Sequence, residues 1–184
     1  MEAVAGLKKV AYRALLFSLS LGLVTSVSDV TRVRAAEQGL AKAQASSLVA
    51  PAVFTPQDFL GDTNAVRAAY DEPPLVLNDQ LNAAALAKAE DMAAKGYWDH
   101  FRPSDGKAPW AFIEENGYHY KVAGENLAKG YKTPEGITRA WMQSPAHLAN
   151  MVSPKYQEVG FASVDSISST GQHVLLTVQM FGSR

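Results

Sequence analysis

Residues 141–150 read WMQSPAHLAN, and they form the most informative stretch of this 184-residue chain. Residues 124–128 read GENLA, and residues 98–101 read WDHF. The three stretches hold two histidines and a glutamate at separate points: His100, Glu125 and His147. Histidine and carboxylate side chains are what a divalent-metal site or a proton-transfer site needs. The separations are too long for one helix or turn, so the fold has to bring these side chains together.

The dipeptide Ser144-Pro145 predicts the start of a short helix, because proline is favoured at the first helical position. His147 and Asn150 stand three residues apart on this helix, so they share a face. Asn150 is therefore well placed to orient a neighbouring group. The alternative interpretation is a helix cap followed by a surface histidine.

His100 falls in a predicted loop between Trp98 and Phe101. We expect both aromatic side chains to be buried and to hold His100 at the rim of the core, although a single histidine in such a place is more often structural than a ligand. Glu125 follows small residues and precedes apolar ones, which predicts a buried hydrogen-bonding anchor or a general base. The residues alone favour the anchor. We expect Asn126 to hold a turn through its side chain.

Composition and missing motifs exclude several classes of protein. The chain has no cysteine, which rules out disulfides, thiolate zinc sites and a cysteine nucleophile. It has no His-Glu-x-x-His run and no Gly-x-Ser-x-Gly elbow, so neither hydrolase signature is present. The net charge of -1 and the lack of a basic stripe argue against a nucleic-acid partner. Without coiled-coil heptads, a monomer is expected.

The N-terminal residues have the pattern of a secretory signal peptide. Lys8, Lys9 and Arg13 precede an apolar run over residues 14–27. The small residues Ala35 and Ala36 come after this run, where cleavage could occur. The run is shorter than the roughly 20 apolar residues of a membrane-spanning helix. The alternatives are an uncleaved anchor, which would be the only membrane contact, or a start codon placed too far upstream. We therefore predict a secreted, periplasmic or cell-envelope protein of bacterial type.

Three segments are expected: a signal peptide or anchor over residues 1–36, a linker over 37–55, and a folded domain over 56–184. Within the domain, caps and apolar periodicity predict helices over 56–70, 79–95, 109–116 and 133–141, and a further short helix from Ser144. Residues 156–164 and 173–181 have strand character, with a turn at 168–171. Helices followed by a hairpin indicate an α+β domain with helices packed on an antiparallel sheet.

Taken in order, these motifs resemble the CAP superfamily, which comprises cysteine-rich secretory proteins, antigen 5 and pathogenesis-related proteins, in its bacterial secreted branch. The matching pieces cover about residues 64–182 and are Asn64-x-x-Arg67, Leu81 to Met92, Trp98-x-His100, Asp105-Gly106, Gly117-Tyr118, residues 124–128, Trp141-Met142, Ser144-Pro145-x-His147-x-x-Asn150, Val159-Gly160 and Gln179-x-Phe181-Gly182. Each piece is weak alone, but their order and spacing are specific.

The resemblance implies an α-β-α sandwich with a surface cleft that holds two histidines and two acids. His100 and His147 match the histidines, which in this family can bind a divalent metal such as zinc, and Glu125 matches the first glutamate. The second glutamate is replaced by Ser144, so a four-residue acid–base mechanism lacks one carboxylate. Glu158 and Asp99 are the candidate substitutes.

Three functions follow as hypotheses. The favoured one is a binding module whose cleft holds a metal through His100 and His147 and takes a lipid, peptide or cell-wall ligand. Glu125 would then orient a histidine, with support from the cleft residues Asn126, Ser144 and Asn150. The second is a metal-dependent hydrolase in which Glu125 moves the proton. The third is a structural domain without catalysis, in which these residues form buried hydrogen bonds.

Overall fold

The computed structural model describes residues 54–184. The predicted signal peptide and nearly all of the predicted linker lie outside the described residues. None of the helices within residues 54–184 combines the length and the apolar character needed to cross a membrane.

Within residues 54–184, five helices begin where the sequence supplies caps or prolines. They are α2 (Pro56–Ala68), α3 (Asp79–Lys95), α4 (Pro109–Glu115), α5 (Pro134–Met142) and α6 (Pro145–Met151). Asn78 caps α3 by accepting hydrogen bonds from the amides of Gln80 and Leu81, and Gly96 ends it with a left-handed φ of 66°. Thr133 caps α5 through the amide of Gly136. The predicted helices are therefore confirmed to within a few residues.

The sheet has four strands in the order β1-β3-β4-β2. They are β1 (Val76–Leu77), β2 (Val122–Lys129), β3 (Glu158–Ile167) and β4 (His173–Ser183). The hairpin of β3 and β4 was predicted, whereas β1 and β2 were not. Strand β2 begins Val-Ala-Gly-Glu-Asn, and glycine, glutamate and asparagine disfavour strands on their own. The sheet is mixed rather than purely antiparallel, because β1 pairs with β3 in parallel.

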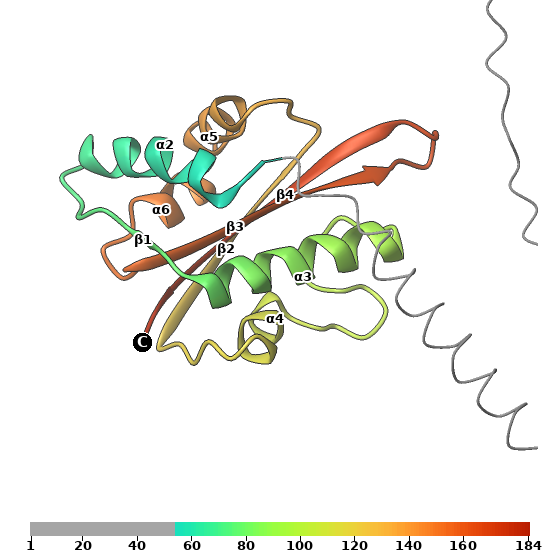
Figure 1. The fold of residues 1–184 in the computed structure, drawn as a ribbon, viewed down its shortest axis with the longest axis horizontal. Coiled ribbons are helices and arrows are strands. Elements are labelled where there is room, and N and C mark those ends of the chain that lie inside the picture. Colours follow the sequence, from blue (N-terminus) through green and yellow to red (C-terminus); the bar gives the residue numbers. More distant parts are fainter. Residues whose placement is uncertain (1–53) are drawn as a thin grey trace, which may run out of the picture. The chain divides into compact units, whose positions relative to one another are not determined.

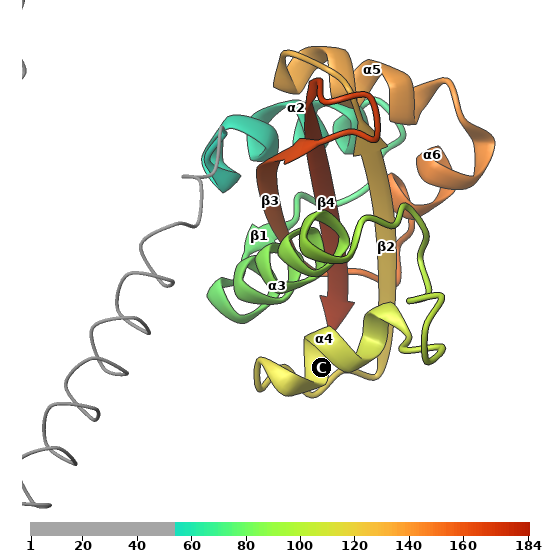
Figure 2. The ribbon, with the colours of Figure 1, turned by 90° about the vertical axis from the view of Figure 1, so that its right-hand side faces the viewer.

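Helices cover both faces of the sheet, as Figures 1 and 2 show. Helices α3 and α4 lie on one face, and α2, α5 and α6 lie on the other. Each face has its own hydrophobic core: one includes Leu81, Phe112 and Met180, and the other includes Phe59, Trp141 and Phe181. The expected α+β class and the expected α-β-α layers are confirmed.

Two motif residues of α2 stabilise the chain around it. The buried guanidinium of Arg67 donates hydrogen bonds to the carbonyls of Pro73, Met151 and Ser153, and so ties α2 to the end of α6. Asn64 exchanges hydrogen bonds with both backbone groups of Leu75. The buried charge of Arg67 is tolerated because Nε and Nη1 have carbonyl partners and the Glu72 carboxylate lies 3.9 Å from Nη2.

Helix α3 lies directly against β3 at Gly160. A Cβ atom at this position would lie 2.1 Å from the carbonyl carbon of Leu81 and 2.3 Å from the amide nitrogen of Asn82. The Asn82 side chain also accepts a hydrogen bond from the amide of Phe161 at 3.0 Å. This contact sets the distance between helix and sheet.

We predict that Gly160→Ala destabilises the protein by about 3 kcal/mol, because neither backbone segment can move aside without opening the core. Urea unfolding followed by circular dichroism measures the effect. Gly61→Ala is the matched control. Gly61 is exposed in α2 with nothing within 4 Å of a built Cβ, so alanine there should stabilise the protein by about 1 kcal/mol through helix propensity. Equal effects of the two substitutions would contradict the close approach.

Candidate functional site

The outer edge of β2 is covered by side chains from the α5–α6 region. The edge carbonyls of Ala123, Glu125 and Leu127 accept hydrogen bonds from three donors, namely the Tyr156 hydroxyl at 3.2 Å, the Asn150 amide at 3.1 Å and the Trp141 indole at 3.0 Å. An edge strand normally presents such groups unpaired. These bonds place α6, and with it His147, beside the strand that carries Glu125.

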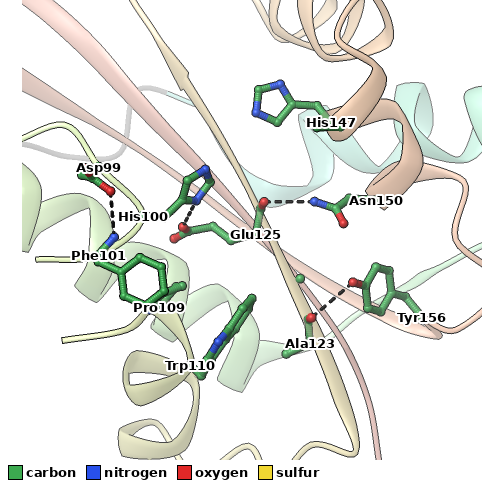
Figure 3. A pocket seen from close by; sticks show the side chains of 12 residues that line it. Asp99, His100, Phe101, Pro109, Trp110, Ala123, Glu125, His147, Asn150 and Tyr156 are labelled. Atoms are coloured by element: carbon green, nitrogen blue, oxygen red, sulfur yellow. Dashed lines mark hydrogen bonds and ion pairs between the residues drawn. The ribbon is translucent and has the colours of Figure 1, made fainter. Parts of the chain in front are cut away.

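Glu125 and His100 meet in this place. His100 Nδ1 lies 2.6 Å from Glu125 Oε1, and Figure 3 shows the two side chains pointing toward each other from the 98–101 loop and β2. The Glu125 side chain is buried, whereas the imidazole is about half exposed. The second carboxylate oxygen, Oε2, is buried and has no hydrogen-bond partner among residues 54–184. An unpartnered buried oxygen costs about 1–3 kcal/mol, so it calls for an explanation beyond packing.

The environment shifts the pKa of each member of the pair upward. The hydrogen bond that the His100 ring donates to Glu125 raises the pKa of His100, and burial raises the pKa of the Glu125 carboxyl. Both shifts mean that the pair holds its protons more tightly than free side chains do. Burial lowers the pKa of His147, and the charge of His100 lowers it further. At neutral pH His147 is therefore the unprotonated imidazole of the site.

These side chains line a hollow of about 360 Å³ between β2, the 98–101 loop, α4 and α6. Its polar lining includes the sequence-predicted His100, Glu125, His147 and Asn150. Aromatic side chains form much of the rest: Phe101, Trp110 and Tyr156 (Figure 3). The expectation that Trp98 and Phe101 are buried is wrong, since they are 37% and 53% exposed. They extend outward because the loop presents His100, and not its neighbours, to the sheet.

Two further predicted cleft residues take other positions. Asn126 does not hold a turn: it is a fully buried strand residue that donates to Gln179 Oε1 and the His147 carbonyl and accepts from Asn150. It fixes α6 against β2 from beneath the hollow. Ser144 lies in a neighbouring hollow that shares only His147 with the first.

Of the two substitute carboxylates, only one is near the site. Asp99 lines the hollow, and its Oδ1 accepts a hydrogen bond from the amide of Phe101. Glu158 is bonded instead to the Asn78 amide at 2.8 Å and to the Tyr118 hydroxyl at 2.6 Å. It belongs to β3, which β4 separates from β2 and from the hollow.

Sequence reasoning missed Lys88. This lysine of α3 is fully buried, and its ammonium donates to the carbonyls of Asp99 at 2.8 Å and His100 at 2.7 Å and lies 3.2 Å from the Tyr97 hydroxyl. Burial lowers its pKa, and the nearby negative charge of Glu125 opposes the shift. Lys88 thus holds the loop that presents His100. The available signal was a lysine on the apolar stripe of α3, where a buried charge needs partners.

The donor set suits a divalent cation with open positions. His100 keeps Nε2 free because Nδ1 is bonded to Glu125, an arrangement that orients many metal-binding histidines. His147 faces the same hollow, and neither of its ring nitrogens has a hydrogen-bond partner among the described residues. Within residues 54–184 no group of three or more His, Cys, Asp or Glu could hold a metal ion. The two imidazoles are metal ligands by chemical type, but they are one fewer than the usual three protein ligands of catalytic zinc.

Comparison with known proteins identifies a family whose sequence model matches this chain. A sequence model of the Cysteine-rich secretory protein family, CAP, matches residues 60–181. YkwD, an uncharacterized protein of Bacillus subtilis (strain 168), is 41% identical over 104 residues, which cover 56% of this chain and 40% of YkwD. YlbC, an uncharacterized membrane protein of the same strain, is 24% identical over 98 residues, 53% of this chain and 28% of YlbC. The chain thus spans less than half the length of these two relatives.

Two solved structures have a similar fold. An extracellular protein of Bacillus anthracis that contains an SCP domain gives a TM-score of 0.59 at 20% identity, over 70% of this chain and 40% of that one. An outer surface protein of Borrelia burgdorferi gives a TM-score of 0.60 at 19% identity, over 73% of this chain and 98% of that one. At these identities the likeness concerns the fold alone.

We predict that Glu125→Gln lowers the pKa of His100, because an amide cannot stabilise the imidazolium as a carboxylate does. A pH titration of the His100 ring signals by NMR measures it. Since the His100 pKa is raised on folding, the stability contributed by the pair is present below the ordinary value of about 6.5 and is lost as the pH rises through the folded-state value.

Glu114→Gln is the control for this titration, since it removes an exposed carboxylate outside the hollow. It should leave the His100 pKa as in the wild type. A His100 pKa that stays the same in Glu125→Gln would contradict the hydrogen bond.

We also predict that Lys88→Met lowers the free energy of unfolding by about 3 kcal/mol, because two carbonyls lose their charged donor. Lys95→Met is the control: Lys95 is exposed and pairs with Asp91 on the same helix, so its loss should cost less than about 1 kcal/mol. Urea unfolding measures both. Similar losses would show that Lys88 does not hold the loop.

Proposed function

The chain belongs to the cysteine-rich secretory protein (CAP) family, and from this premise we propose that it is an exported, monomeric binding protein whose His100–Glu125 hollow takes a ligand. Export is supported by the signal-like pattern of residues 14–27. It is also consistent with the similar folds, which belong to proteins described as extracellular or outer-surface. Release into the medium and retention in the periplasm or envelope both satisfy this proposal.

The observation that carries the proposal is the buried carboxylate at the floor of an open hollow. A structural anchor would use both oxygens of Glu125, yet among residues 54–184 only Oε1 has a hydrogen-bond partner. The volume of about 360 Å³ lies within the range of small-ligand sites. A few convergent polar groups among apolar walls are the usual composition of such a site.

The walls indicate the kind of ligand. Phe101, Trp110 and Tyr156 offer aromatic surface, while Glu125, His100 and Asn150 offer polar groups on one side. This suits a molecule with an apolar face and hydrogen-bonding substituents. Lipid, peptide and cell-wall fragments all meet that description.

A divalent cation such as zinc fits the same hollow. His100 Nε2 and His147 would hold it, with Glu125 orienting the His100 ring through Nδ1. Bound there, the cation would supply an electrophile for an oxygen of the ligand or for water. Lys88 and Asn150 would contribute indirectly, by fixing the loop and the helix that carry the two histidines.

A metal-dependent hydrolase is the second candidate, and the chemistry of Glu125 favours it. Burial raises the pKa of the Glu125 carboxyl, which makes its carboxylate a stronger proton acceptor than a free one. Its Oε2, which has no hydrogen-bond partner among residues 54–184, could accept a proton from water. A divalent cation held by the two imidazoles would supply the positive charge that stabilises the resulting hydroxide. Ser144 stands where the family has its second glutamate, so the four-residue arrangement lacks one carboxylate.

We predict saturable zinc binding to the wild-type protein by calorimetry, and its loss in both His100→Ala and His147→Ala. Glu125→Gln should weaken affinity by about 10- to 100-fold, the usual effect of removing a group that orients a ligand. His119→Ala is the control, because His119 is exposed and outside the hollow. Unchanged binding in either His100→Ala or His147→Ala would remove the metal from this site.

The same proteins distinguish the two candidates. Turnover of a peptide or ester by the wild type that disappears in a folded Glu125→Gln variant would favour the hydrolase. Ligand binding without turnover would favour the binding protein.

A further inference from the structure

A second hollow of about 320 Å³ lies on the other side of His147. The loop residues Trp98 and Tyr131, the end of β2 at Lys129, and Ser144 before α6 contribute to its lining. His147 lines both hollows, so the two are neighbours along β2. The proposed function uses only the first of them.

The exposed aromatic residues of the domain gather at these two hollows. Within residues 54–184, four Phe, Tyr or Trp side chains are more than a third exposed: Tyr70, Trp98, Phe101 and Tyr131. Three of the four line one hollow or the other. Exposed aromatic surface that gathers at concave sites marks a binding surface rather than scattered surface residues.

The second hollow differs from the first in charge. Its lining residues include Lys129 and no Asp or Glu, whereas the first hollow has Asp99 and Glu125. Lys129 forms no ion pair among the described residues, and its ammonium lies 5.7 Å from the centre of the Trp98 ring. A free cation in a hollow without acids is complementary to an anionic group.

The polar groups of this hollow are mostly unused donors. Ser144 stands at the N-cap of α6, yet its side chain makes no capping hydrogen bond. The Tyr131 hydroxyl and the Trp98 indole nitrogen likewise have no hydrogen-bond partner within residues 54–184. A ligand rich in acceptor oxygens would satisfy these groups.

The edge of β2 argues against a peptide that binds as an added strand. Such a peptide would donate its amides to the edge carbonyls. The carbonyls of Ala123, Glu125 and Leu127 already accept hydrogen bonds from side chains. A sugar does not need this edge, because its C–H face lies on aromatic rings and its hydroxyls exchange hydrogen bonds with side chains.

We propose that the second hollow binds an acidic sugar residue of a glycan chain, with the carboxylate paired to Lys129 and the sugar faces on Trp98 and Tyr131. The chain would continue past His147 into the His100–Glu125 hollow. The proposal rests on the proposed function, because it extends the same binding surface and specifies its ligand.

The tryptophan side chains allow a test in which separate NMR signals report on each hollow. Trp98 and Trp141 line the second hollow, and Trp110 lines the first. Trp141 is buried, and its indole N–H donates to the Leu127 carbonyl, so the exposed Trp98 is the reporter of the second hollow and Trp110 that of the first. The indole N–H signals of the ¹⁵N-labelled protein are followed while glucuronosyl-cellobiose, a trisaccharide that carries one carboxylate, is added. Its fully methyl-esterified form, which lacks the charge, is the matched ligand.

We expect the Trp98 signal to move with glucuronosyl-cellobiose and the Trp110 signal to follow. The ester should bind about fivefold more weakly, the factor expected for one partly exposed ion pair. Lys129→Gln should remove this difference between the two ligands. Lys121→Gln is the matched control, because it changes the same charge at an exposed lysine before β2 that lines neither hollow. It should bind as the wild type does.

A Trp98 signal that does not move would overturn the inference, as would equal affinity for acid and ester. Tighter binding of tetra-glutamate than of the sugar acid would overturn it in favour of an acidic peptide. The proposed function fails differently: zinc binding and the Trp110 signal report the first hollow whatever happens at Trp98. Movement of Trp110 alone would leave the proposed function standing and reject the second hollow.

Discussion

The backbone carbonyls at the outer edge of β2 need hydrogen-bond donors, and this need fixes the arrangement of the site. These carbonyls would be unpaired at the margin of the sheet, and side chains of Trp141, Asn150 and Tyr156 bond to them instead. Because these donors lie on α5, on α6 and just after α6, satisfying the edge also brings α6 beside the strand. His147 comes close to Glu125 for this reason. The bond from Asn126, the neighbour of Glu125, to the His147 carbonyl joins residues that are 21 positions apart along the chain.

The site also depends on buried polar groups that are expensive to leave unpaired. Lys88, Arg67 and Asn126 are all buried, and each has several hydrogen-bond partners. Such networks rigidify a structure when they are complete, and they destabilise it when one member is lost. Glu125 is different, since one of its oxygens has no partner among residues 54–184. The contrast separates the groups that build the scaffold from the one that is left available for chemistry.

The two hollows along β2 differ in a way that one ligand could use. The first has acidic groups, a half-exposed imidazole and apolar walls, and the second has a cation, free donors and no acid. His147 belongs to both, and burial keeps its pKa low, so it is neutral near pH 7. A neutral imidazole can donate or accept a hydrogen bond. It can therefore join the two parts of a binding surface without adding charge to either.

Local sequence signals were enough to predict the helices and the β3–β4 hairpin, because caps, prolines and apolar periodicity act over a few residues. The sequence also identified His100, Glu125 and His147 as candidates, and the motif order indicated the family. The pairing of His100 with Glu125, the role of Lys88 and the strand conformation of β2 became visible only in the folded chain. Those features depend on contacts between distant segments, where burial and hydrogen bonding outweigh local propensity. For the same reason Asn126 is buried in a strand rather than placed in a turn, and Trp98 faces outward.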